Sequence, residues 1–279
     1  MKKRDWIFVA IIVCFAIGAF IYFDRVQIMD WAREQNREPL PEAIEYHETK
    51  AATPEVTTPK KTTPVVKTTV PKTEKPSAVP LAPELNLAVP FTSQAPTGDW
   101  SEPFQDSCEE ASVLMVHEFY AGNTSKVIDL TVANQGLLDL VAHENKLFGN
   151  YIDTTVLETA QFAESMYGYT KSDVIENPTI EQIKERLNLG EPVLVPAAGK
   201  LLNNPYFTYP GPEYHMLVVR GYTKTNQFIV NDPGTKHGQA YLYPFDTLMN
   251  AMHDWNKNGD ITNGRKAVLV LHPNSTSNP

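Results

Sequence analysis

The sequence predicts an α+β fold with an antiparallel sheet for residues 83–279. Helical patterns come first in this segment and strand patterns follow them, an order that is typical of α+β domains. Apolar residues make up 42% of the whole chain, which is enough for this segment to bury a hydrophobic core. Its length suits one compact domain with a radius of gyration of roughly 16 Å.

The first half of this segment is predicted to be mainly helical. A short strand is expected over 85–91, where apolar residues run into a loop rich in turn residues. The next element is a helix over 108–120, with Ser107 and Glu110 as its expected capping box and Gly122 as its stop. Periodic apolar residues predict further helices near 131–146, 153–167 and 179–189.

Runs of β-branched and aromatic residues predict the strands of the second half. They cover 192–197, 215–220, 227–231, 239–243 and 267–271. A helix near 245–256 separates the last two of these strands. A short turn joins 215–220 to 227–231, so these two strands are expected to form an antiparallel hairpin.

Residues 6–23 form an uncharged apolar run, which predicts a transmembrane helix. Such a helix would be about 27 Å long, close to the bilayer's hydrocarbon core of about 30 Å. A cleaved signal peptide is the alternative, but the run ends in Ile21-Tyr22-Phe23-Asp24 without a small-x-small cleavage site. Positive charges in residues 1–5 predict a cytoplasmic tail, a single membrane pass and an extracytoplasmic remainder.

A juxtamembrane segment, residues 24–49, leads from this span to a Thr/Pro/Lys-rich linker, residues 50–82. Prolines recur every five residues at Pro54, Pro59 and Pro64, which excludes a regular helix. The linker has too few large apolar side chains to pack a core, so it is predicted to be disordered. In polyproline geometry it would reach about 100 Å, either as a stalk crossing a cell-wall layer or as an inert spacer.

The charge of the chain is unevenly distributed. Residues 1–82 contain 12 of the 24 Lys and Arg and 10 of the 33 Asp and Glu, which leaves +2 there and −11 in the remainder. Nucleic-acid-binding domains need a basic surface, so this class of protein is excluded for the acidic part. A partner of the acidic part is expected to be neutral or cationic and not polyanionic. No metal or phosphate motif is found in the sequence, so no cofactor or metal is expected.

Cys108 is the only cysteine after the apolar run, whereas Cys14 lies within that run. A cysteine in the first turn of a helix is near the positive end of the helix dipole, which favours the thiolate. Glu109 and Glu110 oppose this effect, so a histidine is needed to complete the activation. On its position alone, Cys108 is either a buried packing residue or a nucleophile.

Among the seven histidines, His215 starts an apolar strand of the predicted hairpin. The hairpin brings the start of this strand near Asp232, which follows the second strand. A carboxylate in contact with an imidazole fixes its tautomer and stabilises its charged form. The alternative is that residues 231–234 form an ordinary Asn-Asp-Pro-Gly turn.

Four separated motifs follow one another in residues 83–279. The first two are Val89-Pro90-Phe91-Thr92-Ser93-Gln94, followed by Trp100, and Cys108-Glu109-Glu110-Ala111-Ser112. The other two are His215 with its apolar strand ending at Gly221-Tyr222, and then Asp232-Pro233. Together and in this order, the four motifs resemble the cysteine peptidases of the bacteriocin-leader-processing type, the C39-like family.

This resemblance implies a papain-like fold, with a helical half that carries the cysteine helix and an antiparallel sheet that carries the histidine. It implies that Cys108 is the nucleophile, His215 the general base and acid, and Asp232 the residue that orients His215. Gln94 would be the side-chain oxyanion donor, with Gln105 as the alternative. Glu109 and Glu110 depart from the Gly-Pro that often follows the family's cysteine.

We therefore expect a membrane-anchored, extracytoplasmic bacterial cysteine peptidase that hydrolyses peptide or isopeptide bonds through a thioester. Its expected partners are the membrane, through the N-terminal helix, and peptide or protein substrates, with cell-wall peptides among the candidates. One alternative is a non-catalytic module that binds peptides or cell-wall polymer on the same fold. The other alternative is an acyl transferase that passes the acyl group to an amine.

Overall fold

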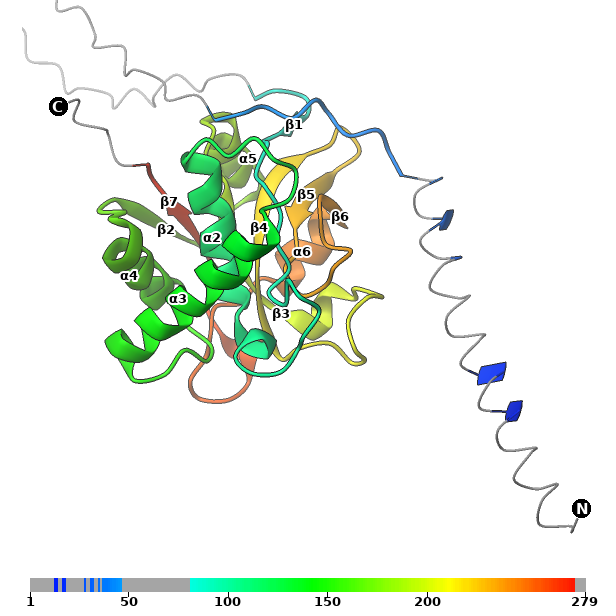
Figure 1. Cartoon of the computed structure of the whole chain (residues 1–279). Coiled ribbons are helices and arrows are strands. Elements are labelled where there is room, and N and C mark those ends of the chain that lie inside the picture. The colour runs from blue at the N-terminus through cyan, green and yellow to red at the C-terminus, as the bar shows by residue number, and fades with distance from the viewer. Residues whose placement is uncertain are drawn as a thin grey trace, which may run out of the picture. The chain divides into compact units, whose positions relative to one another are not determined.

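The computed structural model of the whole chain (Figure 1) describes residues 13–14, 17–18, 28, 31–32, 35, 37–46 and 81–273. The chain divides into two compact units, Met1–Leu40 and Pro41–Pro279. The predicted cytoplasmic tail, most of the predicted span and residues 50–80 of the linker lie outside the described residues. Within the described residues, no helix is both long and apolar enough to cross a membrane.

The second unit includes residues 41–46, upstream of the linker. Ile44 forms a parallel bridge with Leu87. The Ile44 N–H donates to Asn86 O at 2.8 Å, and the Ala88 N–H donates to Ile44 O at 2.7 Å. The expected boundary at residue 83 does not include these contacts, because pairing through the backbone leaves no apolar pattern in the sequence.

Tyr46 extends this contact from the backbone to the helices. Its ring lies edge-on to Phe119, with 5.5 Å between the ring centroids, and edge-on to Tyr120 at 5.1 Å. Edge-to-face aromatic pairs of this kind add about 0.5–1.5 kcal/mol beyond the burial of area. Both flanks of the Thr/Pro/Lys-rich segment therefore contact the same unit.

The described strands form one sheet in the order β2-β7-β3-β4-β5-β6, with β1 paired to β4, and every pair is antiparallel. Their bounds are β1 Leu85–Asn86, β2 Ser172–Glu176, β3 Val193–Ala198, β4 Tyr214–Tyr222, β5 Gln227–Asn231, β6 Tyr241–Pro244 and β7 Ala267–Leu271. The α+β class and the antiparallel sheet are confirmed. The strand β2 was not predicted, because its ends are exposed and it lies at an edge of the sheet.

The helices are α2 Cys108–Tyr120, α3 Leu130–Phe148, α4 Val156–Tyr167, α5 Ile180–Asn188 and α6 Phe245–Ala251. Short 3-10 helices cover Phe104–Asp106, Gly199–Leu202 and Ile261–Asn263. In Figure 1, α2 and α3 lie in front of the sheet, and α2 packs against β4. Ten residues of α2 are buried, including Cys108, which is expected for a helix that is covered on most of its sides.

The expected capping box of α2 is wrong. Ser107 makes no side-chain cap, and its hydroxyl instead donates to Pro103 O at 2.9 Å. The partner residue of the expected box, Glu110, is fully buried, and neither oxygen of its carboxylate has a hydrogen-bond partner. The helix start is therefore held by its packing against β4 and not by its own side chains.

The strands β4 and β5 form the predicted hairpin, with Val218 opposite Asn231 and a shift of register between Val219 and Gly221. Gly221 is needed here because a Cβ at this position would lie 2.2 Å from Leu85 O on β1. A side chain at residue 221 would therefore displace β1 from β4.

Candidate active site

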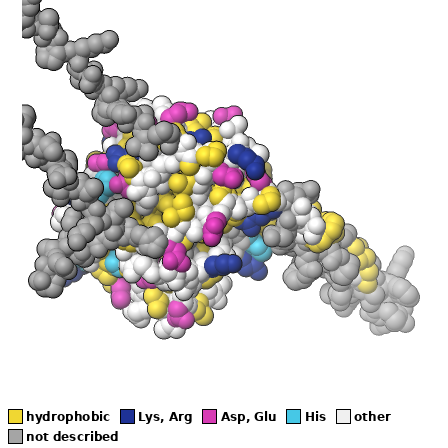
Figure 2. Space-filling view, turned by 90° about the horizontal axis from the view of Figure 1, so that it is seen from above, with side chains coloured by type: hydrophobic (Ala, Val, Ile, Leu, Met, Phe, Trp, Pro, Cys, Tyr) yellow, Lys and Arg dark blue, Asp and Glu magenta, His cyan; other side chains and the backbone are white. Residues whose placement is uncertain are grey.

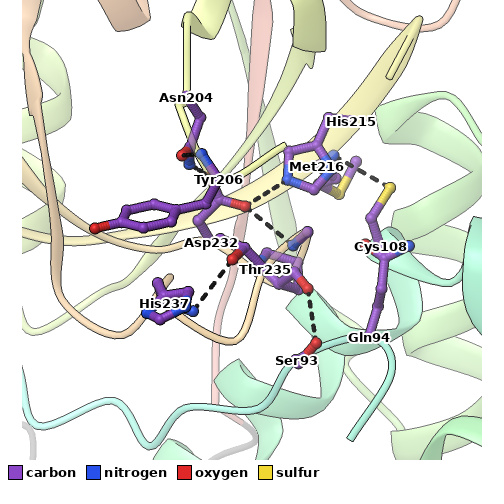
Figure 3. Close-up of polar contacts among 12 residues, drawn as sticks. Ser93, Gln94, Cys108, Asn204, Tyr206, His215, Met216, Asp232, Thr235 and His237 are labelled. Atoms are coloured by element: carbon purple, nitrogen blue, oxygen red, sulfur yellow. Dashed lines mark hydrogen bonds and ion pairs between the residues drawn. The ribbon is translucent and has the colours of Figure 1, made fainter. Parts of the chain in front are cut away.

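Cys108 is the first residue of α2, and its sulfur lies against β4 (Figure 3). The Met216 N–H donates to Cys108 Sγ at 3.3 Å. Met216 directly follows His215 on β4, so this contact places the thiol at the strand position of the histidine. Both residues are buried, because only 5% of Cys108 and 1% of His215 is exposed.

His215 and Asp232 are in direct contact. His215 Nε2 lies 2.7 Å from Asp232 Oδ1, and both residues are buried. Since a carboxylate accepts the hydrogen, this contact assigns the ring proton to Nε2 and leaves Nδ1 as the basic nitrogen. The hairpin of β4 and β5 brings the two residues together, as the sequence predicts.

Asp232 is held by three further donors. Its Oδ1 accepts from the Gly234 N–H at 3.0 Å, and its Oδ2 accepts from Tyr243 Oη at 2.6 Å and from Asn204 Nδ2 at 3.1 Å. Burial alone would raise the pKa of Asp232, but the charge and hydrogen bond of His215, with the bonds from Tyr243 and Gly234, hold it below its usual value. Asp232 therefore stays ionised and keeps the ring of His215 in one tautomer.

Asn204 and Tyr243 also belong to the site, although the sequence did not predict a role for either residue. Asn204 Nδ2 also donates to Tyr243 Oη at 2.8 Å, so the two side chains and Asp232 form a closed triangle of hydrogen bonds. Asn204 lies in a loop and Tyr243 in β6, and no local motif marks either residue. Only the pairing of β5 with β6 brings Tyr243 to Asp232.

The Cys108 thiol donates to Glu109 Oε2 at 3.0 Å and, among the described residues, makes no hydrogen bond to the His215 ring. Burial of the sulfur, followed by the charge and hydrogen bond of Glu109 and the charge of Asp153, raises the pKa of Cys108 well above its usual value. The thiol is therefore protonated in this arrangement. Without a hydrogen bond between them, Cys108 and His215 do not form a thiolate–imidazolium pair in this arrangement.

Gln94 does not present a free amide N–H to the site. Its Nε2 donates to Gln105 O at 2.7 Å and to Phe104 O at 3.1 Å, so both of its amide hydrogens are bound. Its Oε1 is buried and has no hydrogen-bond partner. Gln105, the alternative donor, is exposed. An oxyanion role for Gln94 therefore requires one of these two bonds to be released.

Two carboxyl groups between α2 and α3 are buried without hydrogen bonds. Glu110 on α2 and Glu144 on α3 are both fully buried, and none of their four carboxyl oxygens has a partner. Burial, with the charges of Glu109 and Glu158, raises the pKa of Glu144 to about 10. In the described part of the chain, these groups do not belong to a set of three or more that could hold a metal ion. Glu144 is therefore neutral at physiological pH.

The raised pKa of Glu144 predicts that the unit loses stability as the pH rises. A carboxyl whose folded pKa lies above its unfolded value of about 4.5 binds its proton more tightly in the folded state, so stability falls between about pH 4.5 and pH 10. Glu144→Gln removes this titration. From pH 5 to pH 8, we expect the free energy of unfolding to fall less in Glu144→Gln than in the wild type, by on the order of 2–4 kcal/mol.

Urea denaturation at pH 5, 6.5 and 8 measures this difference. Glu164→Gln is the matched control, because it removes the same group from an exposed position of α4. Equal pH dependence in the wild type and in Glu144→Gln would show that Glu144 ionises at no net cost in the folded protein.

The comparisons with known proteins show the family of this chain. The family model described as Peptidase_C39 like family matches residues 86–263, which is more than half of the chain. The chain belongs to the C39-like peptidase family. It is therefore a cysteine-type peptidase, and the matched residues of this C39-like peptidase include Gln94, Cys108, His215 and Asp232.

The similar solved structures share little sequence with the chain. A Bacillus anthracis protein described as a C39-like peptidase is 17% identical, with a TM-score of 0.44, and the match covers 68% of this chain and 98% of that one. A fragment of Prevotella intermedia prointerpain A is 14% identical, with a TM-score of 0.43, over 68% of this chain and 72% of that one. No curated protein matches the chain.

Proposed function

We propose that the protein hydrolyses peptide or isopeptide bonds on the outer side of a membrane, with Cys108 as nucleophile and His215 and Asp232 as its base and orienting carboxylate. The contact of His215 Nε2 with Asp232 Oδ1 carries the proposal, because it leaves Nδ1 free to take a proton. The sulfur of Cys108, bound to the amide of Met216, supplies the only thiol among the described residues of the second unit.

In the first half of the reaction, the Cys108 S–H proton moves to His215 Nδ1 and the sulfur attacks the substrate carbonyl. The C–N bond then breaks, the leaving amine takes the proton from His215, and a thioester remains on Cys108. In the second half, a water molecule gives a proton to His215 and attacks the thioester. The C–S bond breaks and Cys108 is regenerated with its proton.

The oxyanion of each tetrahedral intermediate needs donors near Cys108. The backbone N–H of Cys108 is one of them, because the first N–H groups of a helix have no partner within the helix. The side chain of Gln94 is the second, once substrate has displaced one of its bonds to the backbone of residues 104–105.

Gln94→Ala is expected to lower turnover by roughly a hundredfold or more, since the loss of one oxyanion donor costs about 2.7–4 kcal/mol. Alkylation of Cys108 by iodoacetamide should persist, because that reaction forms no oxyanion. Gln105→Ala is the matched control and should leave turnover unchanged. If Gln105→Ala lowers turnover and Gln94→Ala does not, the donor is Gln105.

The substrate is expected to be a neutral or cationic peptide. The part of the chain from residue 83 on carries a net charge of −11. Figure 2 shows acidic side chains spread over the face drawn, with basic side chains between them. A polyanionic substrate would therefore meet net repulsion from this part of the protein.

The experiment that tests the reaction is product analysis of a peptide library incubated with the full chain, with and without an added primary amine. A hydrolase gives free carboxyl products in both samples. Products that carry the added amine would show a transferase, and the absence of any new product would favour a module that only binds peptide.

The membrane location is part of the same proposal and rests on the uncharged run of residues 6–23 and the positive charges before it. Protein in the membrane pellet after alkaline carbonate washing, together with cleavage of the folded part by protease added outside the cell, is the expected result. Release of the chain by carbonate would contradict an anchor.

A further inference from the structure

Glu109 is the side chain that accepts the hydrogen bond of the Cys108 thiol in this structure. Its Oε2 accepts from Cys108 Sγ at 3.0 Å, and only 1% of the residue is exposed. Among the described residues, the His215 ring has no such hydrogen bond with the thiol. A buried carboxylate in contact with the sulfur opposes formation of the thiolate, because two anions would then share one site.

The position of Glu109 is fixed from outside the helix. Its Oε1 accepts from the Thr154 N–H at 2.7 Å, and Tyr214 Oη donates to Thr154 O at 2.8 Å. Tyr214 directly precedes His215 on β4. Glu109 is therefore held by the loop before α4, and the same loop is bound to the strand that carries the histidine.

The charged groups that interact with Glu109 are mostly acidic. They include Glu110 from α2, Glu144 from α3 and Asp153 from the loop before α4, each of which feels the charge of Glu109. Burial, the largest effect, raises the pKa of Glu109 above its usual value, and the charge of His215 from β4 acts against this rise. The bonds from Cys108 and Thr154 act in the same direction as His215 and favour the ionised carboxylate.

We propose that Glu109 is a further catalytic residue of this peptidase. It accepts the hydrogen bond of the Cys108 thiol in the resting state, until the S–H bond rotates away from Glu109 towards His215. The inference rests on the proposed role of Cys108 as nucleophile. When the S–H bond rotates, its hydrogen bond with Glu109 breaks, and the same proton then moves from the sulfur to His215 Nδ1. Glu109 keeps its charge and its bond to Thr154, so no other group gains or loses a proton.

Glu109→Gln tests this role through the rate of Cys108 alkylation by iodoacetamide between pH 5 and pH 10. The amide nearly preserves the shape of the side chain and has an N–H that favours the thiolate. We expect the midpoint of the pH profile to fall by at least about one unit. Thiolate then increases tenfold at pH 6, and its lower nucleophilicity offsets part of this, so the rate should rise at least about threefold.

Glu110→Gln is the matched control, because it removes an equally buried carboxyl one residue further along α2 without touching the sulfur. It should keep the wild-type profile. If Glu109→Gln does not fold, Glu109→Asp is the second variant. It retains the charge but moves it away from the sulfur, so it should also raise the alkylation rate at pH 6.

An unchanged or slower alkylation rate in both variants of Glu109 would overturn the inference, as would an equal shift in Glu110→Gln. The assay needs no substrate. A wild-type protein that cleaves no peptide would therefore overturn the proposed function alone, whereas the alkylation profiles decide the role of Glu109.

Discussion

Cys108→Ala is expected to abolish peptide hydrolysis, with turnover lower by about 10⁴-fold or more. Without the sulfur no thioester forms, and nothing else in the site replaces a covalent intermediate. The change should leave the fold intact, because Cys108 is a small residue and α2 packs against β4 through other buried residues as well. Turnover of a peptide selected from the library, measured with thermal denaturation of both proteins, gives the comparison.

Cys14→Ala is the matched control for this change, because Cys14 is the other free cysteine of the chain and lies in the first unit. It should retain wild-type turnover. More than about 1% of wild-type turnover in Cys108→Ala would contradict a covalent mechanism.

His215→Ala is expected to have the second largest effect, a loss of about 10³–10⁴-fold in turnover. The thiol then has no base to receive its proton, and its burial and the contact with Glu109 keep it protonated near neutral pH. Alkylation below pH 8 should be lost as well. Added imidazole should restore part of the hydrolysis, whereas a purely structural defect would not respond to imidazole.

His143→Ala is the matched control, because this histidine lies on α3 and its ring forms a hydrogen bond with Ser165, away from Cys108 and Asp232. It should keep wild-type turnover. Wild-type alkylation rates at pH 6 in His215→Ala would show that His215 is not the base.

Most of the fold was predictable because it depends on local patterns. The helix over 108–120 was predicted with the bounds that the structure gives, since a mostly apolar segment is followed by Gly122, a typical helix stop. The hairpin of β4 and β5 was predictable because a short turn joins two apolar strand patterns that are close in the sequence. The strand β2 and the segment 41–46 were missed, because each joins the unit through backbone hydrogen bonds to distant residues.

The site divides in the same way. The contact of His215 with Asp232 follows from one hairpin, whose two strands are close in the sequence. Asn204 and Tyr243 reach Asp232 from a loop and from β6, so their roles could not be predicted from any motif. The amide of Gln94 was expected to face the oxyanion, but the packing of residues 104–105 turns it to backbone carbonyls.

The sequence alone determined the α+β class, the charge difference between the two parts of the chain, and the order of Gln94, Cys108, His215 and Asp232. These properties depend on composition and on residues that are near neighbours. The tertiary structure alone decided that the Cys108 thiol donates its hydrogen bond to Glu109, because Thr154, which holds that carboxylate, is 45 residues further along the chain. Orientations that depend on such distant contacts exist only after the helices have packed on the sheet.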